Sequence, residues 1–158
     1  MKHKIKNYTL IFLLFFLFSC GFKAINSKND NLIEIEDIQI NGEKRLGYYL
    51  KNEILLNSKK DGENKIKVIL DINKNKNAKI KDVTGKVSRY EINFNAQLSI
   101  LDLRNNLKNK KSFSSSVDFT VSKNHSDTIN AEKKATKNGM VKLGQDMSTY
   151  LILYYKNQ

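Results

Sequence analysis

The sequence has a single cysteine and two histidines among its 158 residues. One cysteine excludes an intramolecular disulfide framework. With only two histidines beside it, most structural zinc sites are excluded as well, because they need four ligands of these types. The sequence also lacks a glycine-rich phosphate-binding loop and an EF-hand pattern. We therefore expect neither a metal site nor a bound cofactor.

Residue patterns that would indicate catalysis are equally sparse. His125 has no cysteine partner, and the adjacent Ser126 and Asp127 are typical helix-capping residues whose spacing forms no catalytic triad. Predicted element breaks separate the acidic residues around Glu34 from Glu132, so no pair of carboxylates suits general acid and base catalysis. We expect that the protein is not an enzyme.

The charge of the chain is strongly one-sided. Lysine and arginine number 28 against 16 aspartates and glutamates, which gives a formal net charge of +12. This excess indicates an anionic partner, such as nucleic acid, a membrane surface or an acidic glycolipid. The basic residues are 25 lysines and 3 arginines, and asparagine is frequent, so codon bias is an alternative source of part of the charge. Length and composition indicate one globular domain.

The first twenty residues have the layout of a secretory signal peptide. Three lysines precede an apolar run over residues 10–18. Nine residues extend about 13 Å as a helix, too short for a bilayer core of about 30 Å. A cleaved signal over residues 1–19 therefore explains the run better than a membrane span, the alternative being a buried N-terminal helix. Export excludes a nucleic-acid partner, because the mature protein would face lipid phosphates instead.

The segment Leu17-Phe18-Ser19-Cys20 resembles the bacterial lipoprotein signal. The resemblance implies that Cys20 carries acyl chains such as palmitate and becomes the mature N-terminus, anchoring the protein in the membrane. Gly21 stands where an aspartate would indicate retention in the inner membrane, so we expect an outer-membrane lipoprotein on the periplasmic side. Residues 20–31 form a polar, lipidated tether, and residues 32–158 form a single domain.

The domain is predicted to contain a strand, a helix, three strands and a final helix. The strongest pattern runs over residues 89–102, where six apolar residues alternate with polar ones, as in a half-buried strand. The expected strands cover residues 32–40, 65–82, 89–102 and 112–121. The first expected helix follows the Asn41-Gly42 turn, and the second covers residues 128–155. One sheet face is apolar and the other is rich in hydroxyl and amide groups. We predict an α+β fold in which two helices cover the apolar face of a four-stranded, mainly antiparallel sheet.

Local signals add detail to these elements. A change of apolar parity predicts a bulge near Asp37, and residues 73–77 predict a bend or a weakly paired stretch. Thr84-Gly85 and Asn105-Asn106 predict turns, and Ser126 or Asp127 is expected to cap the last helix. Gly139 and Gly144 weaken that helix by up to about 1 kcal/mol each and are expected to allow close packing on the sheet.

Several segments together resemble the LPS-assembly lipoprotein family. They are Cys20-Gly21-Phe22, the helix start over residues 42–50, Ser88-Arg89-Tyr90-Glu91-Ile92, Ser99-Ile100-Leu101-Asp102 and Ala131-Glu132-Lys133-Lys134-Ala135. The resemblance implies a 1:1 partnership with the β-barrel that inserts lipopolysaccharide into the outer membrane. The lipoprotein would plug the lumen of this barrel, help it to assemble and contact lipopolysaccharide through cationic side chains.

The expected lipopolysaccharide-binding cations lie near two predicted turns and the start of the last helix. They are Lys81, Lys86, Arg89, Lys123, Lys133 and Lys134. Ordinary solvated surface lysines are the alternative interpretation, and Arg89 could instead pair with an acidic side chain across the strands. At the level of the whole protein, the alternatives are an auxiliary subunit of a lipid transporter, an adhesin or a purely structural envelope lipoprotein.

Overall fold

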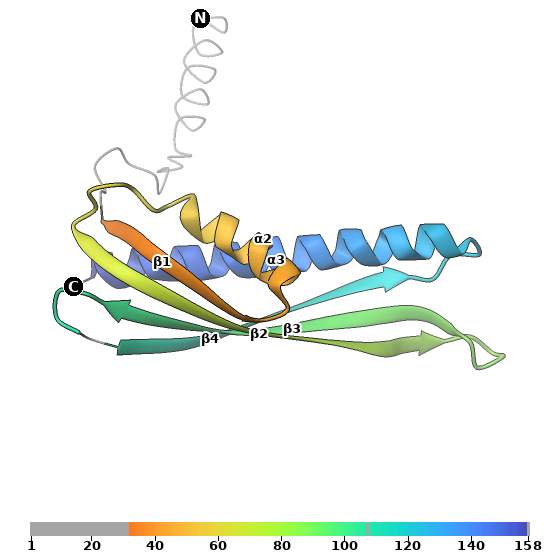
Figure 1. Ribbon diagram of the computed structural model, residues 1–158. Coiled ribbons are helices and arrows are strands. Elements are labelled where there is room, and N and C mark those ends of the chain that lie inside the picture. The colour runs from red at the N-terminus through yellow and green to blue at the C-terminus, as the bar shows by residue number, and fades with distance from the viewer. Residues whose placement is uncertain (1–31, 107, 158) are drawn as a thin grey trace, which may run out of the picture. The chain divides into compact units, whose positions relative to one another are not determined.

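The computed structural model describes residues 32–157 except residue 107. The predicted signal peptide, Cys20 and the tether lie outside the described residues. Within them, the predicted order of elements is confirmed (Figure 1). The elements are β1 (Ile33–Gly42), α2 (Lys44–Leu55), β2 (Asn64–Lys81), β3 (Val87–Asp102), β4 (Lys108–Thr120) and α3 (His125–Lys156).

The four strands form one mixed sheet in the order β1-β2-β3-β4. β1 runs parallel to β2, so the chain needs the crossover helix α2 between them, whereas β2, β3 and β4 are joined by hairpins and pair antiparallel. The register of β1 shifts between Ile35 and Asp37, which confirms the predicted bulge. This bulge lets apolar residues on both sides of it face the core despite their opposite parity.

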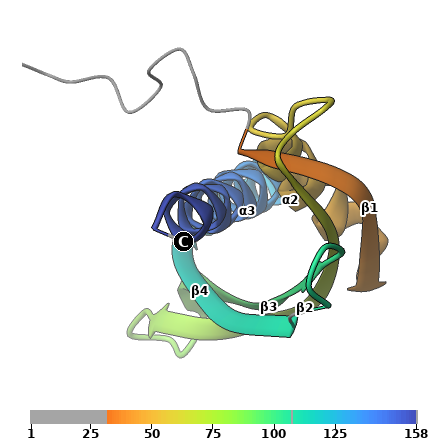
Figure 2. The ribbon, with the colours of Figure 1, turned by 90° about the vertical axis from the view of Figure 1, so that its left-hand side faces the viewer.

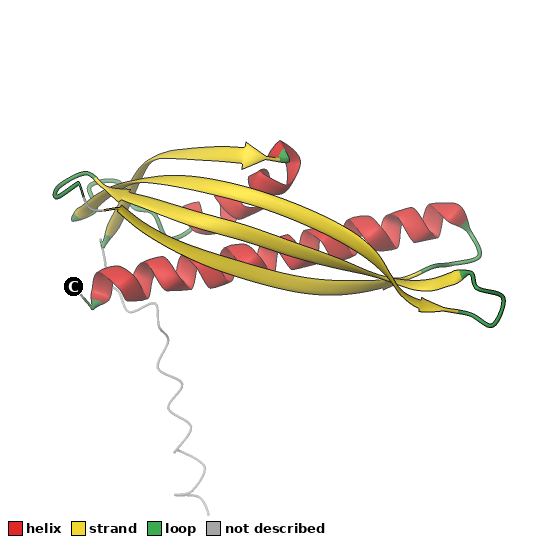
Figure 3. Cartoon of the chain, turned by 90° about the horizontal axis from the view of Figure 1, so that it is seen from below, coloured by secondary structure: helices red, strands yellow, loops and turns green. Residues whose placement is uncertain are grey.

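Both helices lie on the same side of the sheet. Figure 2 shows the sheet curving around them, with α2 between α3 and β1, and Figure 3 shows α3 running along the length of the long strands. The 32 residues of α3 correspond to a length of about 48 Å. The predicted α+β arrangement, with two helices on one side of a four-stranded sheet, is therefore confirmed.

No helix in residues 32–157 is both long and apolar enough to cross a membrane.

Two predictions about the strands were wrong. Residues 73–77 of β2 pair without interruption with β3, from Asn73 opposite Asn95 to Asn77 opposite Glu91. β4 begins at Lys108, which pairs with Leu101, rather than at Ser112. In both cases an adjacent strand supplies regular backbone partners, and this pairing outweighs the poor strand propensity of asparagine and lysine.

The start of α3 also differs from the prediction. Its N-cap is Asn124, whose side chain accepts a hydrogen bond from the Ser126 backbone N–H at 3.1 Å. Asparagine is as good a cap as serine or aspartate, so the sequence alone could not separate these neighbouring residues. The predicted turns are confirmed, with Gly85 and Asn106 at positive φ.

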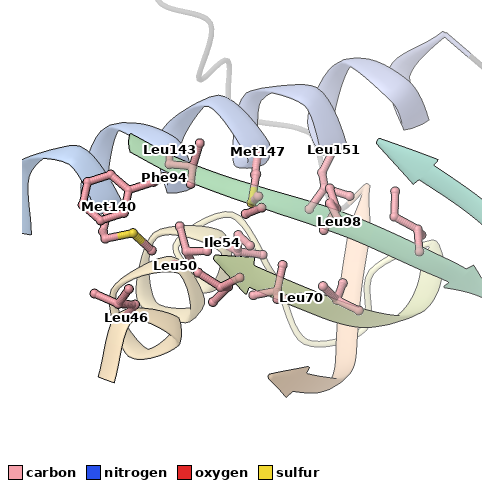
Figure 4. Close-up of a cluster of buried hydrophobic side chains, with 14 of the residues drawn as sticks. Leu46, Leu50, Ile54, Leu70, Phe94, Leu98, Met140, Leu143, Met147 and Leu151 are labelled. Carbon is pink, nitrogen blue, oxygen red and sulfur yellow. The ribbon is translucent and has the colours of Figure 1, made fainter. Parts of the chain in front are cut away.

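The core lies between the helices and the apolar sheet face (Figure 4). Leu50 of α2, Phe94 and Leu98 of β3, and Met140 and Leu143 of α3 are fully buried. Gly139 allows α3 to lie directly on the sheet, because a Cβ there would stand 2.6 Å from the Phe94 ring. Gly144 instead faces α2, where a Cβ would stand 2.7 Å from the Glu53 Cβ. The expected close packing is thus on the sheet for the first glycine and between the helices for the second.

Candidate ligand site at the distal end of the sheet

The β2–β3 turn, the end of β4 and the start of α3 lie at one end of the domain, called here the distal end (Figure 1, right). The β2–β3 turn is held by Asp82, whose carboxylate accepts hydrogen bonds from the Thr84 N–H at 2.8 Å, the Thr84 hydroxyl at 2.7 Å and the Lys86 N–H at 3.0 Å. The hydrogen bond from the Thr84 hydroxyl contributes most to lowering the pKa of Asp82. The turn therefore presents Lys86 on a defined backbone.

The connection between β4 and α3 is similarly ordered. The Val121 N–H donates to the Ser88 carbonyl at 3.0 Å, and the Ser122 N–H donates to the Thr128 hydroxyl at 2.9 Å. Together with the Asn124 cap, these bonds fold the connection against the start of α3. Lys123 lies in this connection, so its backbone is fixed at the same end as the β2–β3 turn.

A groove of about 500 Å³ lies between these segments. Its lining combines lysines from the turn and the connection with aromatic and aliphatic side chains of the sheet and α3. The lining residues are Lys76, Lys86, Val87, Tyr90, Phe119, Val121, Ser122, Lys123, His125, Thr128, Ile129 and Glu132. Such a groove presents apolar surface and positive charge side by side.

Stacked aromatic rings form part of the groove lining. The Tyr90 and Phe119 ring centroids lie 5.5 Å apart, and Lys76 Nζ lies 5.2 Å from the first and 5.9 Å from the second. Glu132 of α3 pairs with Lys76 at 3.0 Å and with Lys74 at 3.7 Å. This pairing ties β2 to α3 and orients Lys76 over the rings, where a cation–π contact is favourable.

The structure brings only part of the predicted cation set to the groove. Lys86 and Lys123 line it, whereas Lys81 and Arg89 are exposed at the same end outside the lining. Lys133 lines a second hollow of about 270 Å³ between α2 and α3, and Lys134 lines neither. Arg89 lies opposite Ile80 and Thr120 and takes part in none of the ion pairs of the described residues, so the suggested pairing with an acidic side chain across the strands does not occur.

Sequence reasoning missed Lys76, Tyr90, Phe119 and Glu132 as members of one site. A signal for Lys76 existed, because it has the same parity as the buried residues of β2 and must therefore face the helix side of the sheet. Its partner Glu132 could not be found in this way. That pairing depends on where α3 crosses the sheet.

The opposite sheet face carries a different chemistry. Along its centre, side chains of the three hairpin strands form cross-strand rows of amides and hydroxyls, for example Asn73, Asn95 and Ser114. A hollow of about 470 Å³ lies among these polar residues. Amides and hydroxyls predominate in this part of the face, with Asp71 at its edge, so that it can both donate and accept hydrogen bonds.

Toward the distal end of the same face, Lys79 bridges two acids. Its Nζ lies 2.9 Å from Glu91 Oε1 and 2.8 Å from Asp118 Oδ2. The hydrogen bond to Asp118, followed by that to Glu91, raises the pKa of Lys79, and the bond from Lys79 lowers the pKa of Glu91. The three charges largely satisfy one another, and we assign them no ligand.

The described residues were also searched for a possible metal site. Within residues 32–157, no group of three or more histidine, cysteine, aspartate or glutamate side chains is arranged to hold a metal ion. His125 is exposed at the rim of the groove. By its lining, the site is a groove of lysine, aromatic and aliphatic side chains.

No protein-family model and no curated protein sequence matches the chain. Solved structures with a similar fold include a candidate lipoprotein of Caulobacter crescentus, with a TM-score of 0.58 at 16% identity over 77% of this chain and 92% of that one. Rare lipoprotein B of Shewanella oneidensis matches with a TM-score of 0.58 at 11% identity over 77% and 97%. A Xanthomonas campestris protein matches with a TM-score of 0.53 at 7% identity over 81% and 89%. At these identities the likeness establishes a shared fold, one that rare lipoprotein B also adopts.

Proposed function

We propose that this protein is an outer-membrane lipoprotein that binds inside the lipopolysaccharide-inserting β-barrel and helps it to assemble, with its distal groove contacting lipopolysaccharide. The observation that carries this proposal is the groove, in which lysines lie beside stacked aromatic rings. Lipopolysaccharide combines phosphates with acyl chains, and both parts find matching chemistry there. Lysine meets a phosphate as a point charge, and the apolar lining suits hydrocarbon.

Two further features support a position in a barrel lumen. The exposed sheet face carries rows of amides and hydroxyls besides a few charged residues, and such a face suits the polar interior of large outer-membrane barrels. The length of α3, about 48 Å, is comparable to the 40–45 Å thickness of a bilayer with its headgroups. A domain of this length can reach from one headgroup level to the other inside a lumen.

The barrel partnership predicts stoichiometric co-purification. We expect that the mature protein, purified through a C-terminal tag from detergent-solubilised outer membrane, brings down a single large β-barrel at about 1:1. Protein staining and mass spectrometry give the identity and ratio. If no barrel accompanies the protein, the plug role is excluded, and the alternative of an auxiliary subunit of a lipid transporter becomes the better hypothesis.

The glycolipid contact predicts a localised effect of charge removal. Replacing Lys86 and Lys123 together with alanine should weaken lipopolysaccharide binding at least tenfold, because each charge-assisted hydrogen bond contributes about 1.5–3 kcal/mol. Titration of lipopolysaccharide into the purified protein gives the affinity. The matched control replaces Lys137 and Lys142, two exposed lysines of α3 outside the groove, and should bind normally. An equal loss in both variants would mean that only total charge matters.

A further inference from the structure

The end of the domain opposite the groove, called here the proximal end, is formed by four chain segments. These are the start of β1, the α2–β2 loop, the β3–β4 turn and the end of α3, and Figure 2 views the molecule from this end. Backbone hydrogen bonds join the first three. The Lys59 N–H donates to the Ile33 carbonyl at 3.0 Å, the Asn64 N–H to the Leu32 carbonyl at 3.0 Å, and the Leu103 N–H to the Lys65 carbonyl at 2.9 Å.

Asn64, Asp102 and Arg104 form a polar cluster that links the chain segments at this end, and the buried Tyr155 lies beside it. The Arg104 guanidinium donates to Asn64 Oδ1, and the Asn64 amide donates to the Leu32 carbonyl at 2.6 Å. The Arg104 N–H donates to Asp102 Oδ1 at 2.9 Å. Burial, and then the adjacent Asp102, raise the pKa of the Tyr155 phenol, so that it stays protonated. The end of α3 is thus packed against the sheet where the chain enters the domain.

Positive charge exceeds negative charge at this end. In the four segments and the four residues of each strand next to them, the cations are Lys59, Lys60, Lys65, Lys67, Arg104, Lys108, Lys110, Lys111 and Lys156, and the acids are Glu34, Glu36, Asp61, Glu63 and Asp102. Of the acids, Glu34 pairs with Lys65 at 3.5 Å, and Asp102 is buried beside Arg104. Most of the lysines therefore face solvent without a fixed counter-charge.

Apolar side chains stand exposed among these cations. Leu56 is 76% exposed at the end of α2, and Leu153 is 47% exposed in the last turns of α3. Tyr150 and Tyr154 lie in the same part of α3, and Lys111 Nζ lies 5.9 Å from the Tyr150 ring centroid. Protein surfaces that lie at a membrane–water interface are typically rich in tyrosine, lysine and exposed leucine, and this end combines all three.

We propose that the proximal end is a docking surface for anionic phospholipid headgroups, so that this end of the domain contacts the membrane in addition to being tethered to it. The inference builds on the lipid-anchored part of the proposed function. Residues 20–31 can reach at most about 40 Å and join the domain at Leu32, at this same end. With Cys20 acylated, as in the proposed function, the tether would keep the proximal end within this distance of the headgroups. A lysine or arginine that reaches the membrane surface contributes about 1 kcal/mol of attraction.

The first test separates place from total charge. A chain starting at Gly21 lacks the acylated cysteine but keeps the whole described domain, which is one compact unit. It should sediment with vesicles containing 30% phosphatidylglycerol and not with pure phosphatidylcholine vesicles. Replacing Lys60, Lys110 and Lys156 with glutamate should weaken binding at least tenfold. The same reversal at Lys134, Lys137 and Lys142, in the middle of α3, should leave it within about twofold, and circular dichroism verifies folding of each variant.

The second test reports which end touches lipid. The Gly21 chain contains no cysteine, so Leu56→Cys and Val83→Cys each provide one site for a polarity-sensitive fluorophore. Leu56 lies at the proximal end, and Val83 is fully exposed in the β2–β3 turn at the distal end. A blue shift at position 56 alone on anionic vesicles supports the proposal. A shift at position 83 alone, equal loss in both charge-reversal variants, or no vesicle binding would each overturn it. None of these outcomes depends on the barrel, so the plug role succeeds or fails separately.

Discussion

Replacing Phe94 with alanine should lower the free energy of unfolding by about 3–5 kcal/mol. The side chain is fully buried at the centre of β3, and its ring fills the space where Gly139 brings α3 close to the sheet. Truncation removes the largest fully buried side chain among the described residues and leaves a cavity between α3 and the sheet. Chemical denaturation followed by circular dichroism measures the loss.

The neighbouring residue provides the control for this experiment. Asn95 is exposed on the polar face, so Asn95→Ala should change stability by less than about 0.5 kcal/mol. A loss below about 1 kcal/mol for Phe94→Ala would contradict the assignment of its ring to the core. Equal losses in both variants would indicate that strand propensity, rather than burial, controls stability at this point of β3.

Replacing Gly42 with alanine is expected to destabilise the protein by about 2–5 kcal/mol, through two additive causes. Gly42 ends β1 with φ at +94°, a conformation that residues with a Cβ rarely adopt. A Cβ at this position would also stand 2.5 Å from the Ile72 backbone carbonyl oxygen, and that atom is held in the β1–β2 pairing. Relieving this contact requires the backbone of the strand end or of its partner to shift.

Gly85 separates the two causes. Its φ is +82°, but a Cβ there would meet no atom within 4 Å. Gly85→Ala should therefore cost only about 1–2 kcal/mol, from backbone strain alone. Thermal or urea unfolding of the two variants measures the difference. Equal costs would show that the approach to Ile72 is relieved by a small backbone shift and that strain accounts for the whole effect.

Much of the fold could be predicted because its signals are local. The alternation through β3 reveals a half-buried strand without any knowledge of its neighbours, and the parity change around Asp37 reveals the bulge. The turns at Thr84-Gly85 and Asn105-Asn106 could be predicted as well, because glycine and asparagine tolerate positive φ better than other residues do. Predictions failed where pairing overrides propensity, as in residues 73–77, whose asparagines and lysines remain in a regular strand because β3 lies beside them.

The candidate site was predicted in part for the same reason. Lys86 is next to a recognisable turn and Lys123 follows the last strand, so both were found from their positions in the sequence. Lys76 and Glu132 are 56 residues apart, and their ion pair forms only because α3 returns over the distal half of β2. Lys134, in contrast, looked equivalent to Lys133 in sequence, yet only Lys133 lines a hollow.

The sequence by itself determined the order of the elements, the parity of each strand and the one-sided charge, because periodicity, turn residues and composition act over a few neighbouring positions. The tertiary structure alone decided which of the cations lie together at each end of the domain. The long antiparallel hairpins and the return of α3 along the sheet bring together residues that are far apart in the chain. A pattern of neighbouring residues cannot predict which of these distant residues come into contact.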